Sequence, residues 1–165
     1  MYEILDVGCG DRPKGDVNCD LFIGNSPHLQ GRTIQPKIIP NFVKCDAHHL
    51  PFKTAAFKET FSSHLIEHVN DPAKVLHEMM RVSREKVTFV IPHRFARASW
   101  WKYRQNPTHQ HFFSTNTIKK WLSKLKTISH YDIEIRFRCF PNDYLCLIRF
   151  PWEIKVTIWK SCSRR

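Results

Sequence analysis

Three observations in the sequence predict an α/β protein with a largely parallel sheet. Short apolar runs without regular in-and-out alternation recur along the chain, as in strands that are buried on both faces. Segments with a helical or loop pattern lie between these runs, as expected for parallel strands that are joined by crossovers. No repeat, composition shift or Gly/Ser-rich linker interrupts the 165 residues, so we expect one domain over residues 1–165.

The expected strands and helices follow from these runs. An amphipathic helix is expected over 65–85, and a second over 114–125, where Ser and Thr are N-cap candidates and Ile118, Trp121, Leu122 and Leu125 share one stripe. A C-terminal antiparallel hairpin is expected from strands at 132–140 and 143–150. The remaining strands are expected at 2–7, 16–21, 41–46, 55–63 and 86–92.

The composition indicates a globular protein with an uneven charge. No apolar run approaches the roughly 18 to 20 residues that cross a bilayer, and no secretory signal opens the chain, so we predict a cytoplasmic protein without membrane contact. Residues 1–80 carry a net charge of −2 and residues 81–165 one of +13. This asymmetry favours a polyanionic partner such as nucleic acid, although a solvated lysine-rich surface explains it equally well.

Chemistry is expected where the strands end, because ligands of open α/β sheets bind outside the carboxyl ends of their strands. Gly8 and Gly10 let backbone N–H groups approach a ligand closely. The third glycine of G-x-G-x-x-G is absent, since Pro13 stands there, which disfavours a nicotinamide dinucleotide. Asp20 and Asp46 end the next two strands, where each can accept from a ligand, or can serve as an ordinary cap or turn residue.

Five blocks occur in one order: "ILDVGCG", "VNCDL", "VKCDAHHLPF", "AFKETFSSHLIEHVNDPAKVLHEMMRV" and "VTFVIPHR". In this order they resemble the class I S-adenosylmethionine-dependent methyltransferases, and most closely the small group similar to methyltransferase type 11. The resemblance covers about residues 2–125. It implies a Rossmann-like, mostly parallel seven-stranded sheet and S-adenosyl-L-methionine as the cofactor.

The resemblance also implies roles for single positions. The glycine-rich loop would hold the methionine part of the cofactor, Asp20 the ribose hydroxyls, and Asp46 with Ala47 the adenine, while Ser63 and His64 would face the sulfonium and the acceptor. In that family "LIEHV" begins a helix without metal. The full set of cofactor-binding residues expected here is Asp6, Val7, Gly8, Cys9, Gly10, Asp20, Leu21, Asp46, Ala47, Ser63 and His64.

One departure from the family concerns the first crossover. Only nine residues separate Gly10 from Asp20, too few for both a strand and the helix that normally precedes it, so we expect this helix to be shortened or missing. The cofactor then loses a helix N-terminus. We hypothesise that Arg12 or Lys14 supplies the missing positive charge to the cofactor carboxylate.

The stretch "HLIEH" at 64–68 admits a different reading, since H-x-x-E-H on a helix can hold zinc. A hydrolase would then use His64, Glu67 and His68. Such a site needs a third protein ligand, usually a distant carboxylate, and no later glutamate stands out for that role. We therefore assign no metal and keep the zinc hydrolase as an alternative.

Histidines are the candidate general bases, because imidazole can accept a proton near neutral pH. His64, His93 and His109 are the candidates, and each can equally be a structural histidine. Aromatic and basic residues at 92–113 suggest an acceptor-binding cover, or else a packed lid. The sequence thus predicts methyl transfer to an N or O acceptor, with RNA favoured by the basic half, and a non-catalytic cofactor-binding accessory module as the alternative.

Overall fold

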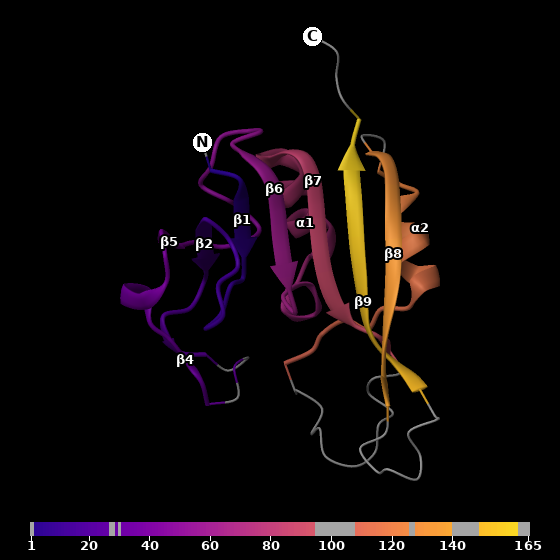
Figure 1. Cartoon of the computed structure of the whole chain (residues 1–165), viewed down its shortest axis with the longest axis horizontal. Coiled ribbons are helices and arrows are strands. Elements are labelled where there is room, and N and C mark those ends of the chain that lie inside the picture. The colour runs from indigo at the N-terminus through magenta and orange to yellow at the C-terminus, as the bar shows by residue number, and fades with distance from the viewer. Residues whose placement is uncertain are drawn as a thin grey trace.

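A computed structural model of the chain describes residues 2–26, 29, 31–94, 108–125, 128–139 and 149–161. These residues build a seven-stranded sheet with the order β5-β2-β1-β6-β7-β9-β8 (Figure 1). Strands β5, β2, β1, β6 and β7 are parallel, whereas β9 is antiparallel to β7 and β8. The expected α/β class, with a mostly parallel sheet and antiparallel C-terminal strands, is confirmed. The strands are β1 (Ile4–Val7), β2 (Val17–Asp20), β5 (Phe42–Lys44), β6 (Phe57–Ser63), β7 (Ser83–Pro92), β8 (Ile128–Cys139) and β9 (Arg149–Lys160).

Smaller elements fill the connections. A two-stranded sheet of β3 (Gly24–Asn25) and β4 (Thr33–Ile34) follows β2, and a short 3-10 helix at Pro36–Ile38 leads to β5. A second 3-10 helix, Ile66–His68, lies between β6 and the first α-helix. In the described part of the chain, no helix has the length and apolar character needed to cross a membrane.

Helix α1 (Pro72–Val82) is shorter than the sequence predicted. Asp71 caps it, because its carboxylate accepts a hydrogen bond from the Lys74 N–H, and Pro72 occupies the first turn, where its missing N–H costs nothing. The expectation that the helix begins at Leu65 is therefore wrong. The segment "HLIEH" forms a turn and one turn of 3-10 helix, so its residues do not share the face of an α-helix.

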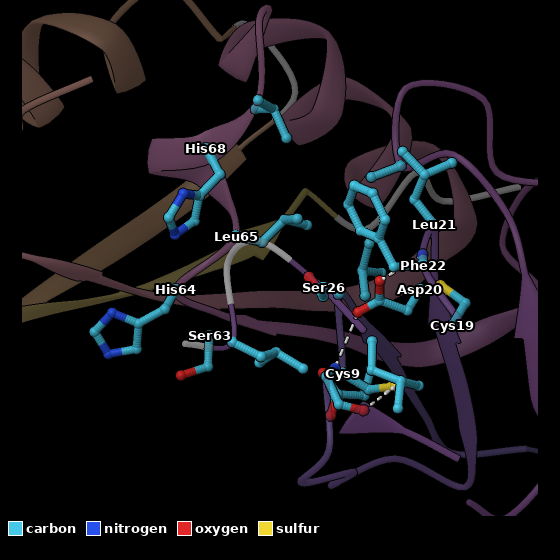
Figure 2. Close-up of a pocket in the computed structure, with 18 of the residues that line it drawn as sticks. Cys9, Cys19, Asp20, Leu21, Phe22, Ser26, Ser63, His64, Leu65 and His68 are labelled. Atoms are coloured by element: carbon cyan, nitrogen blue, oxygen red, sulfur yellow. Dashed lines mark hydrogen bonds between the residues drawn. The ribbon is translucent and has the colours of Figure 1, made fainter. Parts of the chain in front are cut away.

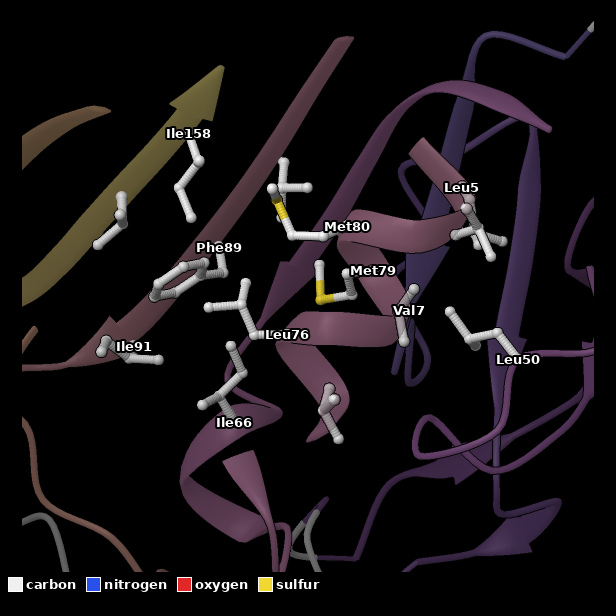
Figure 3. Close-up of a cluster of buried hydrophobic side chains, with 14 of the residues drawn as sticks. Leu5, Val7, Leu50, Ile66, Leu76, Met79, Met80, Phe89, Ile91 and Ile158 are labelled. Atoms are coloured by element: carbon white, nitrogen blue, oxygen red, sulfur yellow. The ribbon is translucent and has the colours of Figure 1, made fainter. Parts of the chain in front are cut away.

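Helix α2 (Thr115–Leu122) matches its expectation closely, with Ser114 as the N-cap. Ile118 and Leu122 are fully buried and join the same core as α1 and the sheet. Figure 3 shows the centre of this core, where Leu76 and Met79 of α1 lie against Phe89 of β7. Each such buried side chain contributes about 1.5–3 kcal/mol relative to leaving it in water.

Only one face of the sheet carries these helices (Figure 1). Within the described residues, charged and polar pairs line the opposite face instead. Lys86 of β7 lies 2.8 Å from Glu59 of β6, and Thr88 donates to the same glutamate at 2.9 Å. No helix of the described part of the chain covers this face, although Asp6, Thr88 and Val90 on it are buried. There the lysine, threonine and glutamate side chains satisfy one another's charges and hydrogen bonds. An apolar surface in the same place would need a helix to cover it.

The missing first crossover helix is confirmed, since residues 8–16 between β1 and β2 contain no helix. The loop lies so close to β1 that a Cβ on Gly15 would stand 2.5 Å from the Val17 oxygen and 2.7 Å from the Asp6 nitrogen. Asn18 is buried and links three strands' ends: its amide accepts from Gly15 N–H and donates to the carbonyls of Gly15 and Pro40. Backbone contacts thus replace helix packing.

The C-terminal hairpin exists, but its second strand lies later than predicted. The expected strand 143–150 falls largely outside the described residues, and β9 runs from Arg149 to Lys160 straight through Pro151. The pairing with β8 shifts between Arg136 and Phe137, so that Trp152 forms a bulge beside the proline. The bulge accommodates Pro151 within the strand.

Asn18→Ala should lower the free energy of unfolding by about 1–3 kcal/mol, because it leaves the half-buried Gly15 N–H and two carbonyls without their partner. Urea unfolding followed by circular dichroism measures the change. Asn25→Ala, at an exposed position of β3, is the matched control and should stay within about 0.5 kcal/mol of the parent. Equal stability of the two variants would show that Asn18 does not replace the helix.

Candidate active site

A pocket of about 1100 Å³ opens at the carboxyl ends of the parallel strands. Its walls come from the loop after β1, the end of β2, the turn after β5 and the turn after β6. Figure 2 shows part of it, with Asp20 and Cys19 across the pocket from His64 and His68. All of the predicted site residues line it: Asp6, Val7, Gly8, Cys9, Gly10, Asp20, Leu21, Asp46, Ala47, Ser63, His64, His93 and His109.

The glycine-rich loop is held in a conformation that favours glycine. Gly8 has φ +72°, and a Cβ on it would stand 2.9 Å from a methyl group of Leu65. The N–H groups of Gly8 and Cys9 both donate to the Cys19 carbonyl, at 2.8 and 3.0 Å. This bond pair draws the loop across the end of β2, so its backbone lines the pocket.

Asp20 joins the glycine-rich loop to the strand end. One carboxylate oxygen accepts from the Gly10 N–H and the other from the Phe22 N–H, each at 3.0 Å. Each oxygen still has capacity for a second hydrogen bond. The carboxylate is therefore both a fixed element of the loop and an acceptor for donors in the pocket.

Asp46 is oriented by the turn that follows β5. Its Oδ1 accepts from the His48 N–H at 2.8 Å and lies 2.7 Å from the His48 ring. Burial alone would raise the pKa of Asp46, but the hydrogen bonds and charge of His48 outweigh burial and lower it. The carboxylate is ionised at neutral pH, and the side chain is 45% exposed to the pocket side, so it can accept from a ligand amine.

Asp6 is the most buried of the three carboxyls, at 2% exposure. Burial raises its pKa to about 6, although the backbone N–H of Lys14 donates to it and Lys14 lies close. Its charge at neutral pH thus opposes folding. A cation or a strong donor in the pocket would relieve this cost.

Two of the cysteines that line the pocket, Cys9 and Cys19, are poor nucleophiles. Burial raises the pKa of Cys9 to about 12, and a hydrogen bond with Cys45 raises the pKa of Cys19 further. Both thiols are therefore neutral at physiological pH. Both thiols pack in the interior beside the glycine-rich loop. Cys19 belongs to the main core and Cys9 to a smaller cluster.

His64 lies in the turn after β6 with φ +55°. Its Nδ1 is 3.2 Å from Glu67 and its Nε2 is 3.0 Å from Glu153 of β9. Burial by itself lowers the pKa of His64, but the bonds to Glu153 and Glu67 outweigh it and raise the pKa to about 9. An imidazolium held by two carboxylates has no lone pair, so this geometry argues against His64 as a general base.

His93 and His109 reach the same pocket from two other segments. His93 ends β7 and is nearly buried; burial first, and then the charge of Arg94, lower its pKa. It is therefore neutral at physiological pH. His109 packs edge-on against His68, with ring centroids 4.6 Å apart. Most of the predicted cover, residues 95–107, lies outside the described residues.

Several pocket residues were not anticipated. One side of the pocket is closed by the segment between β2 and β5, through Phe22, Leu29 and Ile34. Ile34 is buried in a small hydrophobic cluster separate from the main core. Strands of two residues leave no periodic signal, which is why the sequence did not reveal this segment. Trp152 was missed for a different reason, because β9 was placed too early in the chain.

Comparisons with known proteins agree with this geometry. A family model described as a methyltransferase domain matches residues 17–91. No curated protein matches the sequence. A solved S-adenosylmethionine-dependent methyltransferase from Thermotoga maritima superimposes with a TM-score of 0.70 at 17% identity, covering 98% of this chain and 83% of that one. One from Archaeoglobus fulgidus gives 0.65 at 16% identity, covering 97% and 86%, and one from Mesorhizobium loti gives 0.58 at 17%, covering 96% and 91%.

Residues 17–91 match the methyltransferase-domain model, and the chain has the fold of the class I S-adenosylmethionine-dependent methyltransferases, as the resemblance in the sequence predicted. They support S-adenosylmethionine as the cofactor. The pocket residues fit that molecule in kind: three carboxyl groups face a ligand that carries a sulfonium, an amine and hydroxyls, and glycine backbone leaves room for its chain.

Asp6→Asn should stabilise the protein at neutral pH. The raised pKa means that the neutral carboxyl is favoured in the fold, so this contribution is complete below pH 4 and is lost as the pH rises through about 6. Above pH 6 the asparagine variant should be more stable by about 1–3 kcal/mol, with little difference below pH 4. Urea unfolding at several pH values measures this, with Asp132→Asn on β8 as the surface control. A difference that does not change between pH 4 and 7 would contradict it.

Proposed function

We propose that this protein transfers a methyl group from S-adenosylmethionine to a nitrogen or oxygen acceptor. The observation that carries the proposal is the convergence of the glycine-rich loop, Asp20 and Asp46 on one pocket at the strand ends. The bound cofactor supplies a methyl group on a sulfonium, which is already highly activated. The protein has mainly to align donor and acceptor, exclude water and, for some acceptors, remove a proton.

Each residue then has a role that its contacts support. The carboxylate of Asp20, fixed by two backbone N–H groups, would accept from the ribose hydroxyls, and the ionised Asp46 from the adenine amine, beside Ala47. The loop from Asp6 to Gly10 would hold the methionine part. Ser63 and His64, at the opposite wall, would border the acceptor. Leu21 is 49% exposed at the pocket, where it would cover the nucleoside.

A proton acceptor, where the reaction needs one, is supported best at His93. Its lowered pKa keeps the imidazole neutral, whereas His64 is charged. His109 lines the same pocket but contacts His68. We therefore rank His93 first among the three candidate bases.

The basic C-terminal half supports a polyanionic acceptor, with RNA as our choice. Residues 81–165 carry a net charge of +13, and Lys119, Lys120 and Lys124 lie exposed on or just after α2. A nucleic-acid complex of this kind weakens steeply with salt, because phosphate contacts release counterions. A cytoplasmic location stays a prediction.

Two measurements test the proposal. Calorimetry with S-adenosylmethionine should give one site per chain, and radiolabelled methyl groups should then pass to a fraction of cell extract, nuclease-treated and untreated. Cofactor binding without transfer to any fraction would favour the non-catalytic accessory module. Failure to bind the cofactor at all would overturn the proposal.

Asp46→Ala should weaken the binding of S-adenosylmethionine at least ~10-fold, because it removes a charged acceptor worth roughly 1.5–3 kcal/mol. Calorimetry measures the affinity. Asp132→Ala, which removes an exposed carboxylate from β8, should bind as the parent does. Unchanged affinity in the Asp46 variant would contradict the proposed adenine contact.

Arg12→Ala and Lys14→Ala test which side chain supplies positive charge to the carboxylate of the cofactor. Both side chains line the pocket, and the Lys14 ammonium lies 4.9 Å from the centre of the Phe61 ring. At least one variant should lose about 5- to 10-fold in cofactor affinity, and the loss should shrink in high salt, since it is electrostatic. If both variants bind as tightly as the parent, the charge hypothesis is wrong.

A further inference from the structure

Glu67, His68 and His109 form a cluster that the cofactor roles do not use. One ligand atom from each, a carboxylate oxygen and two imidazole nitrogens, lies within 4.8 Å of the other two. His68 and His109 line the pocket on the same side as His64 (Figure 2 labels His64 and His68). The cluster therefore borders the region where an acceptor would bind, away from Asp20.

The glutamate of this cluster is in an unusual state. Its side chain is fully buried, and one oxygen lies 3.2 Å from His64 Nδ1. The other oxygen, Oε2, has no hydrogen-bond partner among the residues that the structure describes. An unmet buried acceptor of this kind destabilises the fold, and more so when it is charged. A cation bound to Oε2 would remove the cost.

The first imidazole is oriented as a metal ligand would be. His68 Nδ1 lies 3.1 Å from the Thr108 carbonyl oxygen and 2.9 Å from the Thr108 hydroxyl oxygen. In the tautomer that donates to the carbonyl, Nδ1 carries the proton. In the neutral ring the lone pair is then on Nε2. Histidines that bind metals commonly donate their other N–H to a backbone carbonyl in this way.

The two residues that follow His109 are held by hydrogen bonds to the backbone of Glu67 and Val69. The N–H groups of Gln110 and His111 donate to the Glu67 carbonyl at 2.8 and 3.2 Å, and His111 Nε2 lies 3.0 Å from the Val69 carbonyl. The segment that carries His109 is therefore fastened to the 3-10 helix that carries Glu67 and His68. The three side chains are brought together by main-chain bonds that do not depend on a metal.

The geometry points to a binding site for one divalent transition-metal ion, with Glu67, His68 and His109 as its ligands. Two imidazoles and one carboxylate suit zinc, cobalt, iron or manganese, and three protein ligands leave a coordination position open. Tetrahedral ligands at zinc lie roughly 3.4 Å apart, so the cluster must contract by about 1 Å. Small rotations of the two imidazoles can supply that.

The open position faces the pocket, which assigns the ion a role in acceptor binding. There it would take an oxygen of the acceptor and lower the pKa of a coordinated hydroxyl, whose proton passes to water. This role rests on the proposed methyl transfer and favours an oxygen acceptor over nitrogen. The metal site itself does not depend on the function.

The test titrates the chelator-treated full-length protein with cobalt chloride, followed by calorimetry and by visible absorption. We expect one ion per chain, and a cobalt spectrum of nitrogen and oxygen ligands. Glu67→Gln, His68→Asn and His109→Asn should each weaken binding at least ~10-fold, since even outer residues of metal sites cost 10- to 100-fold. The ion should also raise the melting temperature of the parent but not of the variants.

His77→Asn is the matched control, because it removes an exposed imidazole from α1 and should bind cobalt as the parent does. Glu67→Gln keeps the shape of the buried side chain, and circular dichroism checks that each variant is folded. A parent that binds no cobalt, or binding that survives all three substitutions, would overturn the site. So would an intense thiolate band, which would place the ion on cysteines instead.

Calorimetry with S-adenosylmethionine on the same samples separates the two proposals. Cobalt binding without cofactor binding supports the metal site and overturns the proposed function. Cofactor binding and methyl transfer that persist after chelation, in a protein that binds no cobalt, overturn the metal site alone.

Discussion

The short return from β1 to β2 is the constraint on which the rest of the molecule depends. Nine residues must carry the chain from the end of one strand to the start of its parallel neighbour, which normally takes a dozen or more. They succeed because Gly15 lies against the backbone of β1 and Asn18 binds the loop to Pro40. The same compact path sets the glycine-rich loop across the pocket.

The two sides of this pocket differ in their charged groups. On one side lie the strand-end carboxyls, where burial, and to a smaller extent the charge of Asp20, raises the pKa of Asp6. On the other, His64 lies between Glu67 and Glu153, so a charged imidazolium compensates two carboxylates. An acidic wall is suited to a cationic cofactor, and the far wall presents fixed charges and imidazoles to whatever approaches it.

The sequence predicted most of what regular patterns can encode. The glycine-rich loop, Asp20 and Asp46 were placed correctly in one pocket, because strand ends of a parallel sheet meet at one edge. The start of α1 was misplaced, since apolar spacing at Leu65 and Val69 outweighed the cap signal of Asp71 and Pro72. Glu67 and His109 lie close together although they are 42 positions apart in the sequence, and no local sequence pattern predicts such proximity.

The charged and polar pairs on the second face of the sheet also bear on how this protein responds to temperature. Apolar area exposed on unfolding sets the heat-capacity change, and polar area reduces it. A sheet whose second face carries pairs such as Glu59 with Lys86 exposes less apolar area per strand than one covered on both sides. The stability curve should accordingly be flatter than for a doubly covered sheet of this length, with stability that changes little across a wide range of temperature.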